Sequence, residues 1–102
     1  MIDELYDLGL KHLENELSTQ DELRQTLSYF NVVISQFDKN NWDINQVCQG
    51  KLFGLAGKLE EKNLNAGNAL FNYLKAQKLN EGAGVKKNAR TLAEKLGIEI
   101  DI

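Results

Sequence analysis

The sequence contains no proline in its 102 residues. A globular chain of this length and average composition carries about five. Inside a helix, proline costs about 3 kcal/mol, because it lacks the amide donor and clashes with the preceding turn. Turns tolerate proline, so a chain built of many turns and strands has no reason to avoid it. The absence of proline therefore favours a chain occupied mostly by helix interiors.

Apolar residues recur at helical spacing along most of the chain. The clearest stripe steps by four, three, four and three residues, which is the pattern of a heptad seam; it consists of Leu23, Leu27, Phe30, Ile34 and Phe37. This seam is too short for a free-standing coiled coil, so packing within a bundle is favoured. The stripes as a whole predict helices over residues 2–17, 19–39, 43–63, 66–79 and 85–96.

Short polar residues mark the expected helix ends. Ser18 and Thr19 each precede an acidic residue by three positions, which is a capping-box spacing. Asp43 and Asn65 stand where the third and fourth helices begin, and Gly97 follows the fifth, where a left-handed terminal residue is common. These signals predict short connections and definite boundaries.

Three glycines interrupt the third predicted helix. Glycine in a helix interior costs up to about 1 kcal/mol, so its repeated use needs a reason. Gly50 and Gly54 lie one turn apart, and Gly57 follows one turn later. We interpret them as a face that lets another helix approach closely. The alternative is a flexible helix that adapts to a partner.

These features predict an all-α fold in a single domain over residues 1–102. Short loops between helices favour antiparallel neighbours. We expect an antiparallel up-and-down four-helix bundle with a short fifth C-terminal helix and an extended tail. The tail, residues 98–102, alternates isoleucine with acidic residues, so its isoleucines would share one side if it were extended. We expect it to lie across the bundle or to be mobile.

Candidate catalytic and metal-binding groups lack the partners they need. One histidine, His12, and one cysteine, Cys48, cannot build a closed zinc site. Cys48 falls on the apolar stripe of the third helix and is expected in the core. The neighbouring acids Glu60 and Glu61 are expected at an exposed helix end. The glycine-containing turn at residues 80–84 matches no phosphate-loop spacing. We expect a non-enzymatic protein with no catalytic, cofactor or metal site.

Composition also bears on the compartment. A single cysteine excludes an internal disulfide, and a reducing compartment is the simplest environment for such a chain. The first residues lack the basic and apolar regions of a signal peptide. No stretch reaches the ~20 apolar residues that span a bilayer. These observations predict a cytoplasmic protein.

Charge is distributed unevenly along the chain. Residues 1–50 carry nine acids against three bases, a net of −6, whereas residues 51–102 carry nine bases against six acids, a net of +3. The predicted fifth helix is short, basic and amphipathic. It could contact an acidic protein face or an anionic membrane surface, or it could be only a solvated outer face. Trp42 has two readings, a hydrophobic staple between the second and third helices or an exposed anchor for a partner.

Nucleic-acid binding is not favoured. Residues 88–98 resemble the first helix and turn of a helix-turn-helix, but only four residues follow them, so there is no recognition helix. The net charge of the chain, −3, also opposes phosphate contacts.

One stretch carries a family resemblance. Residues 68–74, NALFNYL, are followed after a polar turn by a short amphipathic helix that ends near Leu96 and Gly97. With the size and the capped antiparallel helix pattern, this resembles the immunity proteins that protect bacteria from their own pediocin-like bacteriocins. The resemblance covers about a third of the chain and implies a cytosolic bundle at the inner membrane face. It would recognise a membrane transporter receptor with bound bacteriocin and block the lethal pore.

The resemblance assigns recognition to the C-terminal half. In this sequence the partner-binding residues would be four bases and three tail isoleucines: Lys86, Lys87, Arg90, Lys95, Ile98, Ile100 and Ile102. The expected function is thus a bacteriocin immunity protein that works by protein binding, with peripheral membrane contact. The alternatives are a helical adaptor or dimerisation module and a small phage or mobile-element regulator. The chain is expected to be a monomer or a homodimer.

Overall fold

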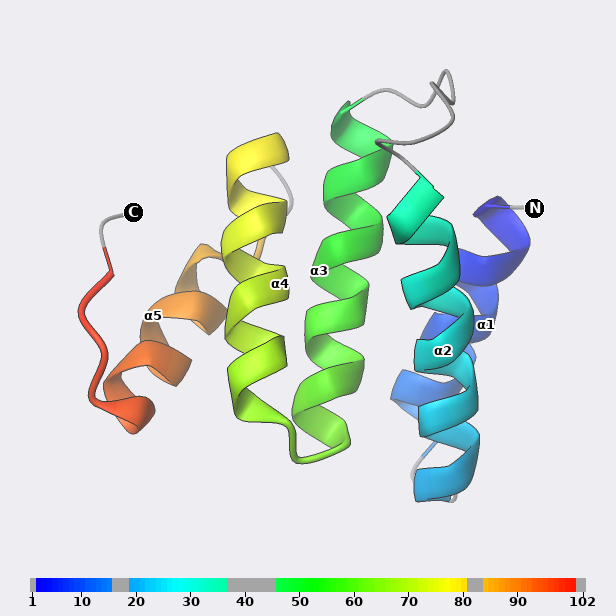
Figure 1. Cartoon of the computed structure of the whole chain (residues 1–102), viewed down its shortest axis with the longest axis horizontal. Coiled ribbons are helices and arrows are strands. Elements are labelled where there is room, and N and C mark those ends of the chain that lie inside the picture. Colours follow the sequence, from blue (N-terminus) through cyan, green and yellow to red (C-terminus); the bar gives the residue numbers. More distant parts are fainter. Residues whose placement is uncertain (1, 16–18, 37–45, 81–83, 101–102) are drawn as a thin grey trace.

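The computed structural model describes residues 2–15, 19–36, 46–80 and 84–100. Within these ranges the chain forms helices and no strand (Figure 1). The helices are α1 (Ile2–Glu14), α2 (Gln20–Gln36), α3 (Gln46–Lys62), α4 (Ala66–Leu79) and α5 (Lys86–Leu96). The predicted all-α class with a short fifth helix is confirmed, and residues 98–100, where an extended tail was expected, have no regular secondary structure.

The helices are arranged in two layers. The molecule measures 36 × 33 × 20 Å, and its shortest dimension is about two helix diameters. Figure 1 shows α2, α3 and α4 side by side and antiparallel, with α1 behind α2 and α5 behind α4. The central helix is α3, which contacts α1, α2 and α4, whereas α5 packs on α4.

The predicted seam of α2 faces the core. Leu23, Leu27 and Phe30 are buried, and Ile34 is partly buried against the same cluster. Val33, which the heptad pattern left out, is buried as well. A helix that faces a protein core buries a wider strip of its surface than the two positions per heptad of a coiled-coil seam. Val33 lies within that wider strip. Phe37 lies outside the described residues.

The glycines of α3 provide close helix contact. A Cβ atom at Gly57 would lie 2.6 Å from the ring of Tyr73, and one at Gly50 would lie 2.6 Å from the Cβ of Asn80. Gly54 faces Val85, whose Cγ1 would be 3.2 Å away. All three face α4 or the segment that leads from α4 into α5. The close-packing interpretation of the glycine face is therefore confirmed.

Several predicted caps are present. The Oγ1 of Thr19 accepts a hydrogen bond from the amide of Glu22 at 3.2 Å, and the Oδ1 of Asn65 accepts one from the amide of Asn68 at 3.4 Å. Gly97 adopts the left-handed conformation, with φ 69°, at the end of α5. Ser18, Trp42 and Asp43, which the sequence also singled out, lie outside the described residues.

The expectation for Cys48 was wrong, because its side chain is exposed rather than part of the core. It lies in the first turns of α3, which extend beyond the end of α4 (Figure 1). The apolar stripe of α3 becomes buried only from Leu52 onward, where the flanking helices cover it.

Candidate functional site

The basic residues predicted for partner binding lie on the outside of α5. Lys86, Lys87, Arg90 and Lys95 are all exposed. The opposite side of α5 packs into the core through Ala89, Leu92 and Ala93. The helix is therefore amphipathic, as predicted.

The structure divides these bases between two flanks of α5. Lys87 and Lys95 lie eight residues apart, so they share one flank with Thr91 between them. That flank borders a groove between α5 and α3. Lys86 and Arg90, one turn apart, lie on the other flank and do not line this groove. The predicted set is thus not one continuous patch.

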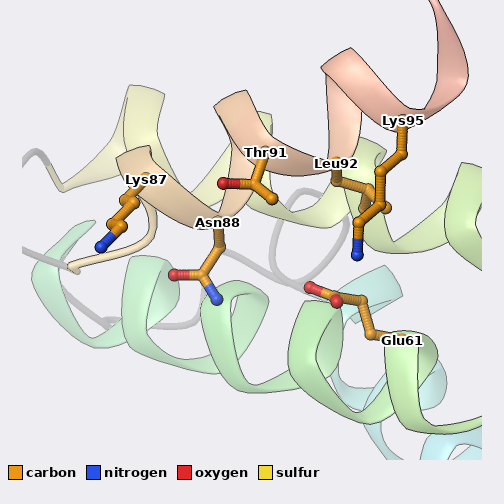
Figure 2. A pocket seen from close by; sticks show the side chains of 6 residues that line it. All are labelled: Glu61, Lys87, Asn88, Thr91, Leu92 and Lys95. Carbon is orange, nitrogen blue, oxygen red and sulfur yellow. The ribbon is translucent and has the colours of Figure 1, made fainter.

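The groove between α3 and α5 has a volume of about 180 Å³ and mixes charged, polar and apolar side chains (Figure 2). Its lining consists of Glu61, Lys87, Asn88, Thr91, Leu92 and Lys95. Figure 2 shows the side chains of Lys95 and Glu61 pointing toward one another across the groove, and the amide of Asn88 pointing toward α3.

A buried tyrosine holds the carboxylate of this groove in place. Tyr73 has no exposed surface, and its hydroxyl donates a hydrogen bond of 2.5 Å to Oε1 of Glu61. Its ring lies against Gly57, where any side chain would collide with it. Burial raises the pKa of Tyr73, and the hydrogen bond and charge of Glu61 raise it further, while a hydrogen bond with Asn88 opposes the shift. Tyr73 therefore remains a neutral donor at physiological pH.

The groove presents several hydrogen-bond donors around the Glu61 carboxylate, which already accepts the hydrogen bond from Tyr73. Two ammonium groups, the Asn88 amide and the Thr91 hydroxyl can contact a ligand. This donor set fits an acidic group of a partner.

The Cys48–His12 pair does not come together as a nucleophile and its base. His12 lies near the end of α3, because the Nζ of Lys62 donates to the His12 carbonyl oxygen at 2.6 Å. Cys48 lies fourteen residues earlier along α3, about 20 Å away at 1.5 Å per residue. In the part of the chain that the structure describes, no three potential metal ligands cluster together.

The tail isoleucines do not share one environment. Ile98 is 49% exposed and follows Leu96, which is 40% exposed, whereas Ile100 is partly buried against the core. The expectation that the isoleucines share one side held only for an extended tail, and it stays a prediction. Ile102 lies outside the described residues.

Sequence reasoning also misplaced the acids at the end of α3. Glu60 and Glu61 were expected to be exposed, but Glu60 is buried and Glu61 is partly buried beneath α5. Neither Tyr73 nor Asn88 was predicted as part of a site. The four-residue spacing of Lys87, Thr91 and Lys95 was the one available signal, since it predicts a shared helix flank.

No family model matches the chain, and no curated protein and no solved structure is similar enough to be matched.

Proposed function

We propose that the chain is a non-enzymatic binding protein that acts as a bacteriocin immunity protein. In this proposal it recognises a membrane transporter receptor with bound bacteriocin from the cytosol. The supporting observation is the C-terminal element, which combines exposed bases with exposed apolar side chains. Mixed basic and apolar surfaces suit both protein recognition and contact with anionic lipid.

The membrane contact in this proposal is peripheral. None of the described helices has the length and apolar character needed to cross a bilayer. The exposed bases of α5 lie on its outer side, where they could approach an anionic lipid surface. Their rigid attachment to α4 through Leu92 and Ala93 would fix the orientation of the bundle.

The test is protection of a bacteriocin-sensitive strain that expresses the chain. We expect growth in the presence of at least one pediocin-like bacteriocin of a panel. Replacing Lys87 and Lys95 together by glutamate should reduce survival to that of cells without the gene. The matched control replaces the exposed Lys11 and Lys51, which do not line the α3–α5 groove, and changes net charge equally. Sensitivity to every bacteriocin of the panel refutes the immunity function, and equal loss in both double variants refutes the assignment to α5.

A second candidate function is dimerisation through the α1–α2 surface. Tyr29 and Val32 are 48% and 62% exposed, and they border an apolar groove with Leu5, Leu8 and Val33. The glycine face of α3 is not open to a second copy of the chain, because α4 already covers it. Sedimentation of the wild type and of Val32→Glu at high concentration tests this function, and a monomer in both cases excludes it.

A further inference from the structure

A second groove runs over α3 between α2 and α4. It consists of two adjoining pockets with volumes of about 210 and 240 Å³, and both pockets include Ile34, Phe53 and Phe71. The two flanking helices share no extensive contact with each other, so α3 forms the floor. No residue of α1 or α5 lines either pocket. This surface is separate from the α3–α5 groove, so a role for it does not depend on the immunity function.

The smaller pocket contains two buried polar side chains without partners. Glu60 is 5% exposed and Asn72 is 8% exposed. Among the described residues, neither the Glu60 carboxylate nor the Asn72 amide has a hydrogen bond or an ion pair. Both side chains line the pocket, together with those of Asn31 and Asn68. Their polar atoms are not among the fully enclosed side-chain atoms that lack a partner, so the Glu60 carboxylate and the Asn72 amide keep some contact with solvent at the pocket and are open to a ligand there.

The chemistry of the pocket selects a cation. Burial raises the pKa of Glu60 because its carboxylate loses hydration. A cationic nitrogen restores the lost interaction, since it supplies both opposite charge and N–H donors. The amide oxygens of the three asparagines can accept further N–H groups. The ring of Phe71, 63% exposed beside the pocket, offers a face for a cation–π contact.

The size and length of the groove point to a protein side chain rather than a free ligand. The pocket of about 210 Å³ is smaller than the ~300–1,000 Å³ typical of drug-sized ligands. The groove continues into the second pocket, where the partly buried Ile34 and Leu79 provide apolar contacts that a small cation would leave uncovered. At that far end stands Lys75, which would repel a second basic group.

We propose that this groove binds a protein partner by taking one of its arginine or lysine side chains into the Glu60–Asn72 pocket. An apolar residue of the partner then lies along Phe71 toward Leu79. The ion pair with Glu60 provides specificity, because a neutral residue in the same place leaves the carboxylate without a partner.

The experiment titrates the full-length chain with short blocked peptides. Acetyl-Arg-Ala-Leu-amide is compared with the same peptide carrying citrulline, the neutral analogue of arginine. We expect binding to be reported by shifts of the side-chain amide signals of Asn31, Asn68 and Asn72 in nuclear magnetic resonance spectra. The citrulline peptide should bind about tenfold more weakly or worse, because it lacks the charge.

The decisive variant is Glu60→Gln, which should abolish the preference for arginine over citrulline. Glu14→Gln is the matched control, since Glu14 is exposed on α1 and the change in net charge is identical. Phe71→Ala is a second variant, chosen because an exposed side chain can be removed without loss of folding. It should weaken both peptides.

Three outcomes overturn the proposal. The first is equal affinity of the wild type for the arginine and citrulline peptides. The second is an absence of shifts at the groove asparagines. The third concerns the source of the cation: if methylguanidinium alone binds as tightly as the arginine peptide, the pocket holds a free small cation and not a residue of a protein partner.

Discussion

On the side of α3 that meets α4, glycines let the two helices approach until side chains of one helix touch the backbone of the other. On the side that lies between α2 and α4, the larger Phe53 and the charged Glu60 form the floor of an open groove. The acids Glu60 and Glu61 are adjacent in sequence but belong to different surroundings. Glu61 accepts a hydrogen bond from Tyr73, whereas Glu60 is buried with no partner among the described residues.

The difference shows that the size of the side chains on α3 decides which of its faces packs closely against another helix and which leaves an open groove. Close contact at the glycines stabilises the bundle by dispersion and by excluding water, so it leaves no room for a ligand. The groove side gives up part of this stabilisation, since partial desolvation of the Glu60 carboxylate, which has no ion-pair partner among the described residues, is costly. We interpret the first face as scaffold and the second as a surface for recognition.

The largest expected effect comes from filling the close contact. Gly57→Ala places a methyl group 2.6 Å from the ring of Tyr73, which must then move. We expect a loss of about 2–3 kcal/mol in the free energy of unfolding, as for other overpacked core positions. Chemical denaturation monitored by circular dichroism measures it.

Gly67→Ala is the control for that substitution, because a Cβ at this position of α4 meets no atom within 4 Å. It should be neutral or stabilise by up to about 1 kcal/mol, since alanine favours the helix. A similar loss of stability in both variants would contradict the close-contact interpretation of the glycine face.

A smaller effect is expected from Tyr73→Phe, which removes the hydroxyl that holds Glu61. The expected loss is about 1.5–2 kcal/mol, the lower end of the range for a hydrogen bond to a charged group, because Glu61 is only partly buried. Tyr29→Phe provides the control, because its exposed hydroxyl contacts only the exposed Gln25, and it should change stability by less than about 0.5 kcal/mol. Equal effects of the two substitutions would mean that the Tyr73–Glu61 bond contributes nothing beyond a surface contact.

The contribution of Tyr73 to the stability of the fold should also depend on pH in the alkaline range. The pKa of Tyr73 is raised above its ordinary value of 10.0 in the folded protein. The folded state therefore holds this proton more tightly than the unfolded state, and the associated stability declines as the pH rises above 10.0. The difference in stability between wild type and Tyr73→Phe should shrink over that range in denaturation curves measured at successive pH values.

The smallest expected effect has the opposite sign. Glu60→Gln removes a desolvated charge and should stabilise the protein by up to about 1 kcal/mol at neutral pH. The pKa of Glu60 in the folded protein is raised above 4.5. The contribution of Glu60 to the free energy of unfolding is therefore favourable below pH 4.5 and is lost as the pH rises through the raised pKa. The stability advantage of the variant should therefore appear only above that pKa.

Thermal unfolding at pH 4 and pH 7 measures this difference, and Glu14→Gln should show none of it, because Glu14 is exposed. A destabilised Glu60→Gln at pH 7 would indicate that the carboxylate already has a partner, and the contrast between the two faces of α3 would fail.

Much of the fold was predictable from local sequence patterns. The α2 seam of Leu23, Leu27 and Phe30, the caps at Thr19, Asn65 and Gly97, and the close approach at the α3 glycines all follow from spacing along one helix. The basic outer face of α5 followed from the same reasoning. Such features depend on residues within one or two turns of each other, so a single sequence carries them.

The candidate sites were less predictable, because the burial of each α3 side chain depends on which neighbouring helix covers that side of α3. The sequence by itself determined the helices, their ends and the glycine face. Only the tertiary structure decided that Cys48 is exposed, that Lys62 caps the end of α1, and that Glu60 and Glu61 have unlike partners. Successive residues of a helix point about 100° apart, so neighbours in sequence enter different interfaces, and only the placement of the other helices assigns each one its surroundings.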